Sequence, residues 1–138
     1  MIICQAIFAD AMKLEYLPDG AERCPLVRIY DFDTAGARCI HDAFCSLASG
    51  LSQRVRLDEI TPVDAVDGCR ITFTRGAQDR GVVQVAEREF DVVLTALGWE
   101  QTAGLAEPFR DNCSCGYQWL TEQASSDIEL LFSPGGGW

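Results

Sequence analysis

The stretch PLVRIYDFDTAGARCIHDAFCSLASG, residues 25–50, is the part of the chain that decides the fold. It begins with a run of strand-forming residues, 26–32, bounded by a proline at residue 25. Asp33 and Thr34 follow, and either side chain can accept a hydrogen bond from an unpaired N–H of a first helical turn. The stretch therefore predicts a strand, a helix cap and a helix, around which the rest of the chain packs.

The helix that follows the cap is amphipathic. Gly50 provides its C-terminal stop, because glycine readily adopts the left-handed conformation that ends many helices. His41 and Cys45 are four residues apart and fall together at the margin of the apolar face. Apolar residues at spacings of three and four form one stripe, which we expect to lie on a sheet: Ala37, Ile40, Phe44, Leu47, Ala48 and Leu51.

Before and after this helix in the sequence, apolar and polar residues alternate in several segments, which predicts strands. Residues 12–32 predict an antiparallel hairpin with a turn at Pro18-Asp19-Gly20. A short second helix is expected within residues 97–109, where two glycines and a proline limit its length. The remaining strands and hairpins are expected at residues 54–58, 69–74, 82–95 and 117–132.

The order of these elements is ββα ββ ββα ββ, without the regular β–α alternation that is typical of parallel sheets. We therefore expect a single α+β domain over residues 1–138, with an antiparallel sheet built from hairpins and one long and one short helix packed on one face. Thr-Ala-Gly occurs at both 34–36 and 102–104, which leaves an internal duplication open. Residues 1–10 are compatible with helix or strand.

Composition limits the classes of function. The 138 residues carry a formal net charge of −10, and 48% of them are apolar. This length is sufficient for one domain with its own core. The negative field repels phosphate backbones and anionic headgroups, so neither nucleic acid nor a membrane is an expected partner. The apolar run at residues 2–9 lacks a preceding positive segment and is too short to span a membrane, so we expect a cytoplasmic protein.

Arginine outnumbers lysine ten to one, with Lys13 as the single lysine. This bias is typical of a GC-rich genome and suits a bacterial protein, such as one encoded by a mobile gene cassette. The seven cysteines are an odd number in a chain for which no export signal is predicted. We therefore expect reduced thiols, several of them buried.

A zinc site would need about four cysteine or histidine ligands within tetrahedral reach. On a helix, Cys39 points about 160° away from His41, which separates two of the available ligands. Cys113 and Cys115 are spaced by one residue rather than the two to four of common zinc sites. We therefore expect no metal and no cofactor, although metal binding by this cysteine pair stays open.

The sequence Asp31-Phe32-Asp33-Thr34, at the end of an apolar strand, resembles the first motif of haloacid-dehalogenase-type phosphatases. The resemblance implies a hydrolase in which Asp31 attacks phosphorus and Asp33 acts as acid and base. It covers about ten residues and lacks the residue that the family places between the second aspartate and the threonine. The alternative assigns Asp33 as a helix cap and Asp31 as a surface strand residue.

Aromatic side chains point to binding, because large amphipathic rings anchor pockets and interfaces. Trp99, at a strand-to-helix corner beside Glu100, is the most site-like of them. Tyr117 and Trp119, two apart on one strand, belong either to the core or to a site, and Trp138 adds a further ring. Three arginines, Arg70, Arg75 and Arg80, are expected on a solvated face of a sheet. The alternative is that they form a pocket for an anion.

The sequence favours a small acidic, non-catalytic protein that binds a protein partner or a small-molecule ligand, and that forms a homodimer through sheet edges or an apolar patch. An inhibitor of a basic protein is one subtype, because complementary fields accelerate encounter. The competing class is a small hydrolase or a metal- or thiol-dependent enzyme that uses Asp31 and Asp33, or His41 and Cys45. The predicted binding residues are Trp99, Glu100, Tyr117, Trp119, His41 and Cys45.

Overall fold

The computed structural model describes residues 11–20, 22–112, 116–122, 124 and 126–138. The expectations for residues 1–10 and for Cys113 and Cys115 lie outside these ranges. In the described part of the chain, no helix has both the length and the apolar character needed to cross a membrane.

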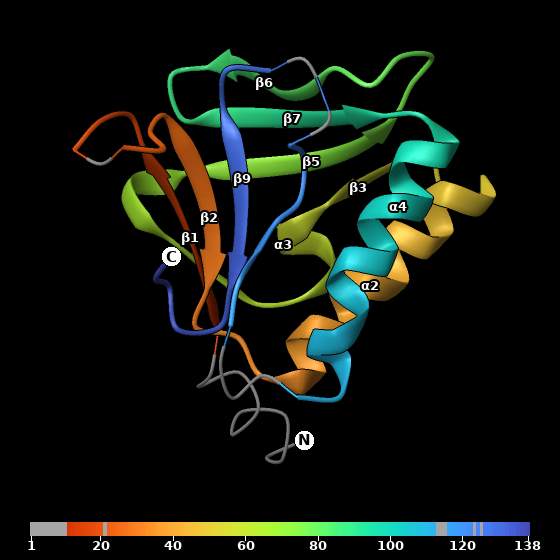
Figure 1. The fold of residues 1–138 in the computed structure, drawn as a ribbon, viewed down its shortest axis with the longest axis horizontal. Coiled ribbons are helices and arrows are strands. Elements are labelled where there is room, and N and C mark those ends of the chain that lie inside the picture. Colours follow the sequence, from red (N-terminus) through yellow and green to blue (C-terminus); the bar gives the residue numbers. More distant parts are fainter. Residues whose placement is uncertain (1–10, 21, 113–115, 123, 125) are drawn as a thin grey trace.

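Two mixed β-sheets form the framework, and the strands of one run across those of the other (Figure 1). The first sheet has the order β4-β1-β2-β9-β8, with these bounds: β1 Met12–Leu17, β2 Leu26–Tyr30, β4 Val63–Ala65, β8 Gln118–Trp119 and β9 Glu129–Ser133. The second sheet has the order β3-β5-β7-β6, with these bounds: β3 Arg54–Arg56, β5 Arg70–Arg75, β6 Gly81–Ala86 and β7 Glu89–Leu94.

The three predicted hairpins are confirmed as the antiparallel pairs β1–β2, β6–β7 and β8–β9. The prediction of one purely antiparallel sheet is wrong, because β2 pairs with β9, β1 with β4 and β5 with β7 in parallel. Alternating polarity shows which side chains face the core, but it does not show which distant strand lies alongside or in which direction.

The long helix α2 (Thr34–Ser49) has the predicted caps. The Asp33 carboxylate accepts a hydrogen bond from the Gly36 N–H at 2.9 Å, and Gly50 adopts the left-handed conformation with φ 84°. Arg75 adds a C-terminal contact by donating to the carbonyl oxygens of Leu47 and Ala48 at 3.2 and 3.4 Å. The caps therefore set the length of α2 as the sequence predicts.

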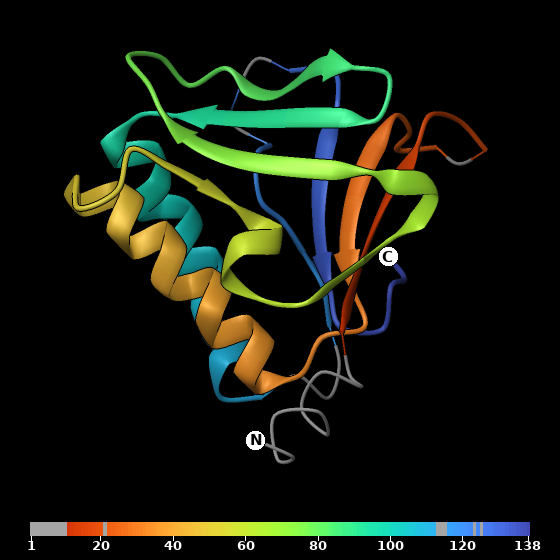
Figure 2. The ribbon, with the colours of Figure 1, turned by 180° about the vertical axis from the view of Figure 1, so that it is seen from behind.

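The apolar stripe of α2 is confirmed for its first four members, which are fully buried: Ala37, Ile40, Phe44 and Leu47. Leu51 was expected on the same stripe but is 86% exposed, because it lies beyond the end of the helix at Ser49. The second helix, α4 (Ala96–Ala106), lies beside α2 on one side of the sheets (Figures 1 and 2).

Three shorter helical segments connect the main elements: α3 Leu57–Ile60 and the 3₁₀ helices η1 Val66–Gly68 and η2 Glu107–Arg110. Seen from behind, α3 and the segment that follows it cross from the helices to the start of β5 (Figure 2).

The core lies between the two sheets and the helices, where the rings of Phe44, Phe73 and Trp99 meet with centroids 5.1 to 5.8 Å apart.

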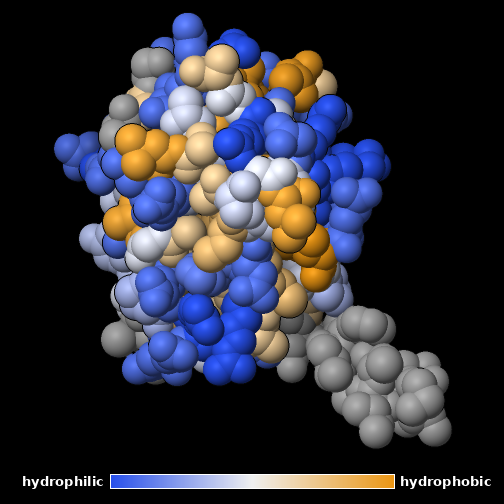
Figure 3. Space-filling view, turned by 90° about the vertical axis from the view of Figure 1, so that its right-hand side faces the viewer, coloured by the Kyte–Doolittle hydropathy of each residue, from blue (hydrophilic) through white to orange (hydrophobic). Residues whose placement is uncertain are grey.

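The side of the molecule that carries α2 and α4 shows separate apolar spots among polar residues (Figure 3). Leu51 and Leu97 are large apolar side chains that remain exposed, Leu97 at 63%. Scattered exposed apolar residues are normal for a folded protein and do not by themselves define an interface.

Candidate functional site

Trp99, predicted as the most site-like residue, lies in the core instead. It is fully buried, and its indole N–H donates to the Thr74 carbonyl oxygen at 2.9 Å. Thr95 caps α4 by accepting from the Gly98 N–H at 3.1 Å, and the helix that starts there turns Trp99 inward. The neighbouring Glu100 is exposed. Trp99 therefore has no surface on which a ligand could bind.

His41 and Cys45 lie together on α2 but do not form an activated pair. The Cys45 sulfur is 3.8 Å from His41 Nδ1 and 3.7 Å from Nε2. Because these distances are nearly equal, the sulfur is in line with neither nitrogen, as a hydrogen bond to the ring would require. Burial raises the pKa of the Cys45 thiol, and the nearby Asp42 carboxylate raises it further. Both effects disfavour the thiolate that nucleophilic catalysis needs.

Asp31 and Asp33 are occupied by structural contacts. Asp33 caps α2, as the alternative to the phosphatase motif predicts. Asp31 is an exposed residue with φ 56°, and its carboxylate lies 3.5 Å from the Lys13 ammonium. Within the described ranges, no three histidine, cysteine, aspartate or glutamate side chains are placed to hold a metal ion.

Tyr117, Trp119 and Trp138 form an aromatic cluster at the edge strand β8. The ring of Trp119 is 6.4 Å from Tyr117 and 6.0 Å from Trp138, and the Arg23 guanidinium lies 4.2 Å above the Trp119 ring. Tyr117 and Trp138 are exposed, and Trp119 is partly buried. The structure thus brings these predicted site residues together on the surface and not in the core.

A pocket that the sequence did not reveal lies between the edges of the two sheets. The ladder between β3 and β5 runs only as far as the pair of Arg56 with Thr72, because α3 begins at the next residue, Leu57. The first two residues of β5, Arg70 and Ile71, therefore have no partner from β3. Across this gap, β4 pairs with β1 of the other sheet. The resulting pocket has a volume of about 250 Å³.

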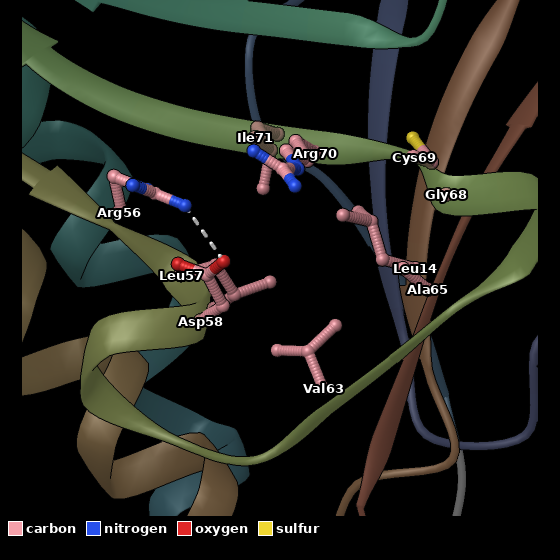
Figure 4. Close-up of a pocket in the computed structure, with 10 residues that line it drawn as sticks. All are labelled: Leu14, Arg56, Leu57, Asp58, Val63, Ala65, Gly68, Cys69, Arg70 and Ile71. Carbon is pink, nitrogen blue, oxygen red and sulfur yellow. Dashed lines mark hydrogen bonds and ion pairs between the residues drawn. The ribbon is translucent and has the colours of Figure 1, made fainter.

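The pocket has an apolar floor and a charged rim (Figure 4). Val63 projects into it from β4, and its floor consists of four almost fully buried residues: Leu14, Leu57, Cys69 and Ile71. Burial raises the pKa of the Cys69 thiol to about 11, so this side chain is a neutral apolar lining group at physiological pH.

Charged side chains from three elements form the rim. Arg56, the last residue of β3, donates to the Asp58 carboxylate of α3 at 2.9 Å. Arg70, the first residue of β5, is exposed and lines the pocket. Among the described residues it forms no salt bridge and no side-chain hydrogen bond. The rim therefore combines one paired and one unpaired guanidinium.

The structure separates the three arginines that the sequence grouped on one sheet face. Arg75 binds the carbonyl oxygens at the end of α2, Arg80 is exposed, and Arg70 lines the pocket. Alternation along β5 places Arg70 on the opposite side from Ile71, but it does not reveal that β3 stops short of both residues. The gap in the ladder is a tertiary feature without a local sequence signal.

Comparisons of this chain with known protein families, curated proteins and solved structures gave no match.

Proposed function

We propose that this protein is a non-catalytic binding protein that holds a small, largely apolar ligand in the pocket between α3, β4 and β5. The observation that carries the proposal is the buried apolar floor beneath an open, charged rim. Ligand sites typically combine an apolar lining with a few polar groups that fix orientation. The pocket has this composition.

The volume sets the size of the ligand. An apolar cavity of roughly 150 Å³ holds benzene, so the pocket of about 250 Å³ is suited to a ligand of about ten non-hydrogen atoms. At the low ligand efficiency of about 0.3 kcal/mol per atom, such a ligand binds with about 3 kcal/mol, a Kd of several millimolar. A ligand that makes more contacts with the apolar floor than this efficiency assumes binds with a lower Kd.

The contacts of the alternative catalytic residues support binding over catalysis. The Asp33 carboxylate is engaged as a helix cap, and the Cys45 thiol has a raised pKa beside a histidine that is not aligned with it. Neither group is among the residues that line the pocket. The proposal therefore assigns the pocket a role in holding a ligand.

The test is an NMR titration of isotope-labelled protein with small apolar compounds of about ten non-hydrogen atoms, at up to about 10 mM. Binding in the pocket shifts the methyl resonances of Leu14, Leu57 and Ile71. The variant Val63→Phe places a phenyl ring in the pocket and is expected to abolish these shifts, whereas the matched control Val85→Phe changes an exposed residue of β6 and leaves them intact. The proposal fails if no compound shifts these resonances, or if Val63→Phe binds as well as the unmodified protein.

A further inference from the structure

We infer that the ligand of this pocket is a monocarboxylate whose anionic group is bound at the rim by Arg70 and Arg56 and whose apolar part lies on the floor. This inference rests on the proposed function, because it names the class of ligand for the same pocket. It arises from the charge pattern of the rim, which differs from that of the molecule as a whole.

The chain has 21 acidic residues against 11 lysines and arginines, so an arginine is more easily paired than an acid. Arg38 and Arg75 donate to backbone carbonyl oxygens. Five further cations lie within 4.0 Å of carboxylates: Lys13, Arg23, Arg28, Arg56 and Arg88. Four arginines have no such contact among the described residues: Arg54, Arg70, Arg80 and Arg110. Of these four, only Arg70 lines the apolar pocket.

The position of Arg70 follows from the strand that it begins. Its backbone N–H donates to the Arg88 carbonyl oxygen at 2.8 Å, which fixes this end of β5 against the β6–β7 turn. On the other edge, the ladder with β3 has already ended at Thr72. The backbone is therefore anchored on one side, while the side chain borders the gap that forms the pocket.

Arg56 approaches the same pocket from β3 (Figure 4). Its contact with Asp58 holds the guanidinium at the rim, where it can share an anion with Arg70. Together, Arg56, Asp58 and Arg70 carry a net charge of +1, which matches one carboxylate. The fork of N–H donors on a guanidinium also fits the two oxygens of a carboxylate.

The nearest alternative partners for Arg70 do not remove this charge. Glu89 is its register neighbour on β7, but the two side chains form no salt bridge in the described structure. Asp67 instead lies 4.0 Å from Arg88. A guanidinium beside a low-dielectric floor binds a carboxylate more strongly than one surrounded by water.

The inference is tested with octanoate and its neutral counterpart octanamide, which have the same number of non-hydrogen atoms. Affinities are measured by NMR titration of the pocket methyl groups at physiological ionic strength. A hydrogen bond to a charged group contributes about 1.5 kcal/mol or more, so octanoate should bind at least about tenfold more tightly than octanamide. Arg70→Gln should remove about this factor for octanoate and leave octanamide unchanged.

Arg80→Gln is the matched control, because it removes the same charge from an exposed residue outside the pocket. It should leave both affinities unchanged. Equal affinities for octanoate and octanamide in the unmodified protein would overturn the monocarboxylate inference and leave the binding pocket standing. Absence of pocket shifts with both compounds would overturn the inference, and the proposed function fails with it if none of the other apolar compounds shifts these resonances. Because the two ligands are compared in the unmodified protein, the test does not depend on the folding of any variant.

Discussion

Replacing Trp99 with phenylalanine should destabilise the protein by about 2 kcal/mol. The substitution removes the indole N–H that donates to the Thr74 carbonyl oxygen at 2.9 Å, which costs about 1 kcal/mol. It also leaves roughly 40 Å³ of empty space beside Phe44 and Phe73, and at about 24 cal/mol per Å³ this adds about 1 kcal/mol. A tryptophan at a solvent-accessible binding site would instead change stability by at most about 0.5 kcal/mol.

The measurement is urea unfolding followed by circular dichroism, with the free energy of unfolding extrapolated to water. Trp138→Phe is the matched control, because it makes the same substitution at an exposed ring. The variant at Trp99 should have a clearly lower midpoint and an unchanged slope. If Trp99→Phe costs no more than Trp138→Phe, the assignment of Trp99 to the core is refuted.

Two further predictions concern the cap of α2 and the thiol in the pocket floor. Asp33→Ala should lower the free energy of unfolding by about 1 kcal/mol through loss of the cap. Asp31→Asn removes only an exposed ion pair with Lys13 and keeps a residue type that tolerates the positive φ at this position, so it should cost less than about 0.5 kcal/mol. Equal losses in urea unfolding would contradict the cap assignment. The Cys69 thiol loses its proton near pH 9 in the unfolded chain but only near pH 11 in the folded protein, because its pKa is raised there. Between these two pH values only the unfolded chain is deprotonated, so the free energy of unfolding should fall by about 2 kcal/mol as the pH rises through this range. Cys69→Ala should show a smaller fall in reducing buffer, and an identical pH dependence in the two proteins would show that Cys69 does not contribute.

Features of the fold that depend on neighbouring residues could be predicted from the sequence. The cap at Asp33, the stop at Gly50 and the buried stripe of α2 all depend on residues within a few positions of one another. The hairpins were predictable for the same reason, since a turn such as the one at residues 18–20 joins the strands that pair.

Features that depend on distant residues could not be predicted in this way. The pairing of β2 with β9 brings Leu26 beside Glu129, and no local pattern specifies that partner. Trp99 was misplaced because a tryptophan at the start of a helix can face either the core or solvent, and only the positions of Phe44 and Phe73 decide between them. The pocket was missed because it arises where β3 ends, not from any residue that lines it.

The aromatic cluster and the pocket are both surface features, but their polar groups are satisfied to different degrees. At the cluster, the Arg23 guanidinium stacks on Trp119 and donates to Glu122 at 2.7 Å, so its charge already has a partner within the chain. At the pocket, Arg70 forms neither a cation–π contact nor a salt bridge among the described residues. A ligand at the cluster would have to compete with existing contacts, whereas an anion at the pocket adds contacts without breaking one at Arg70. This difference favours the pocket as the site of function.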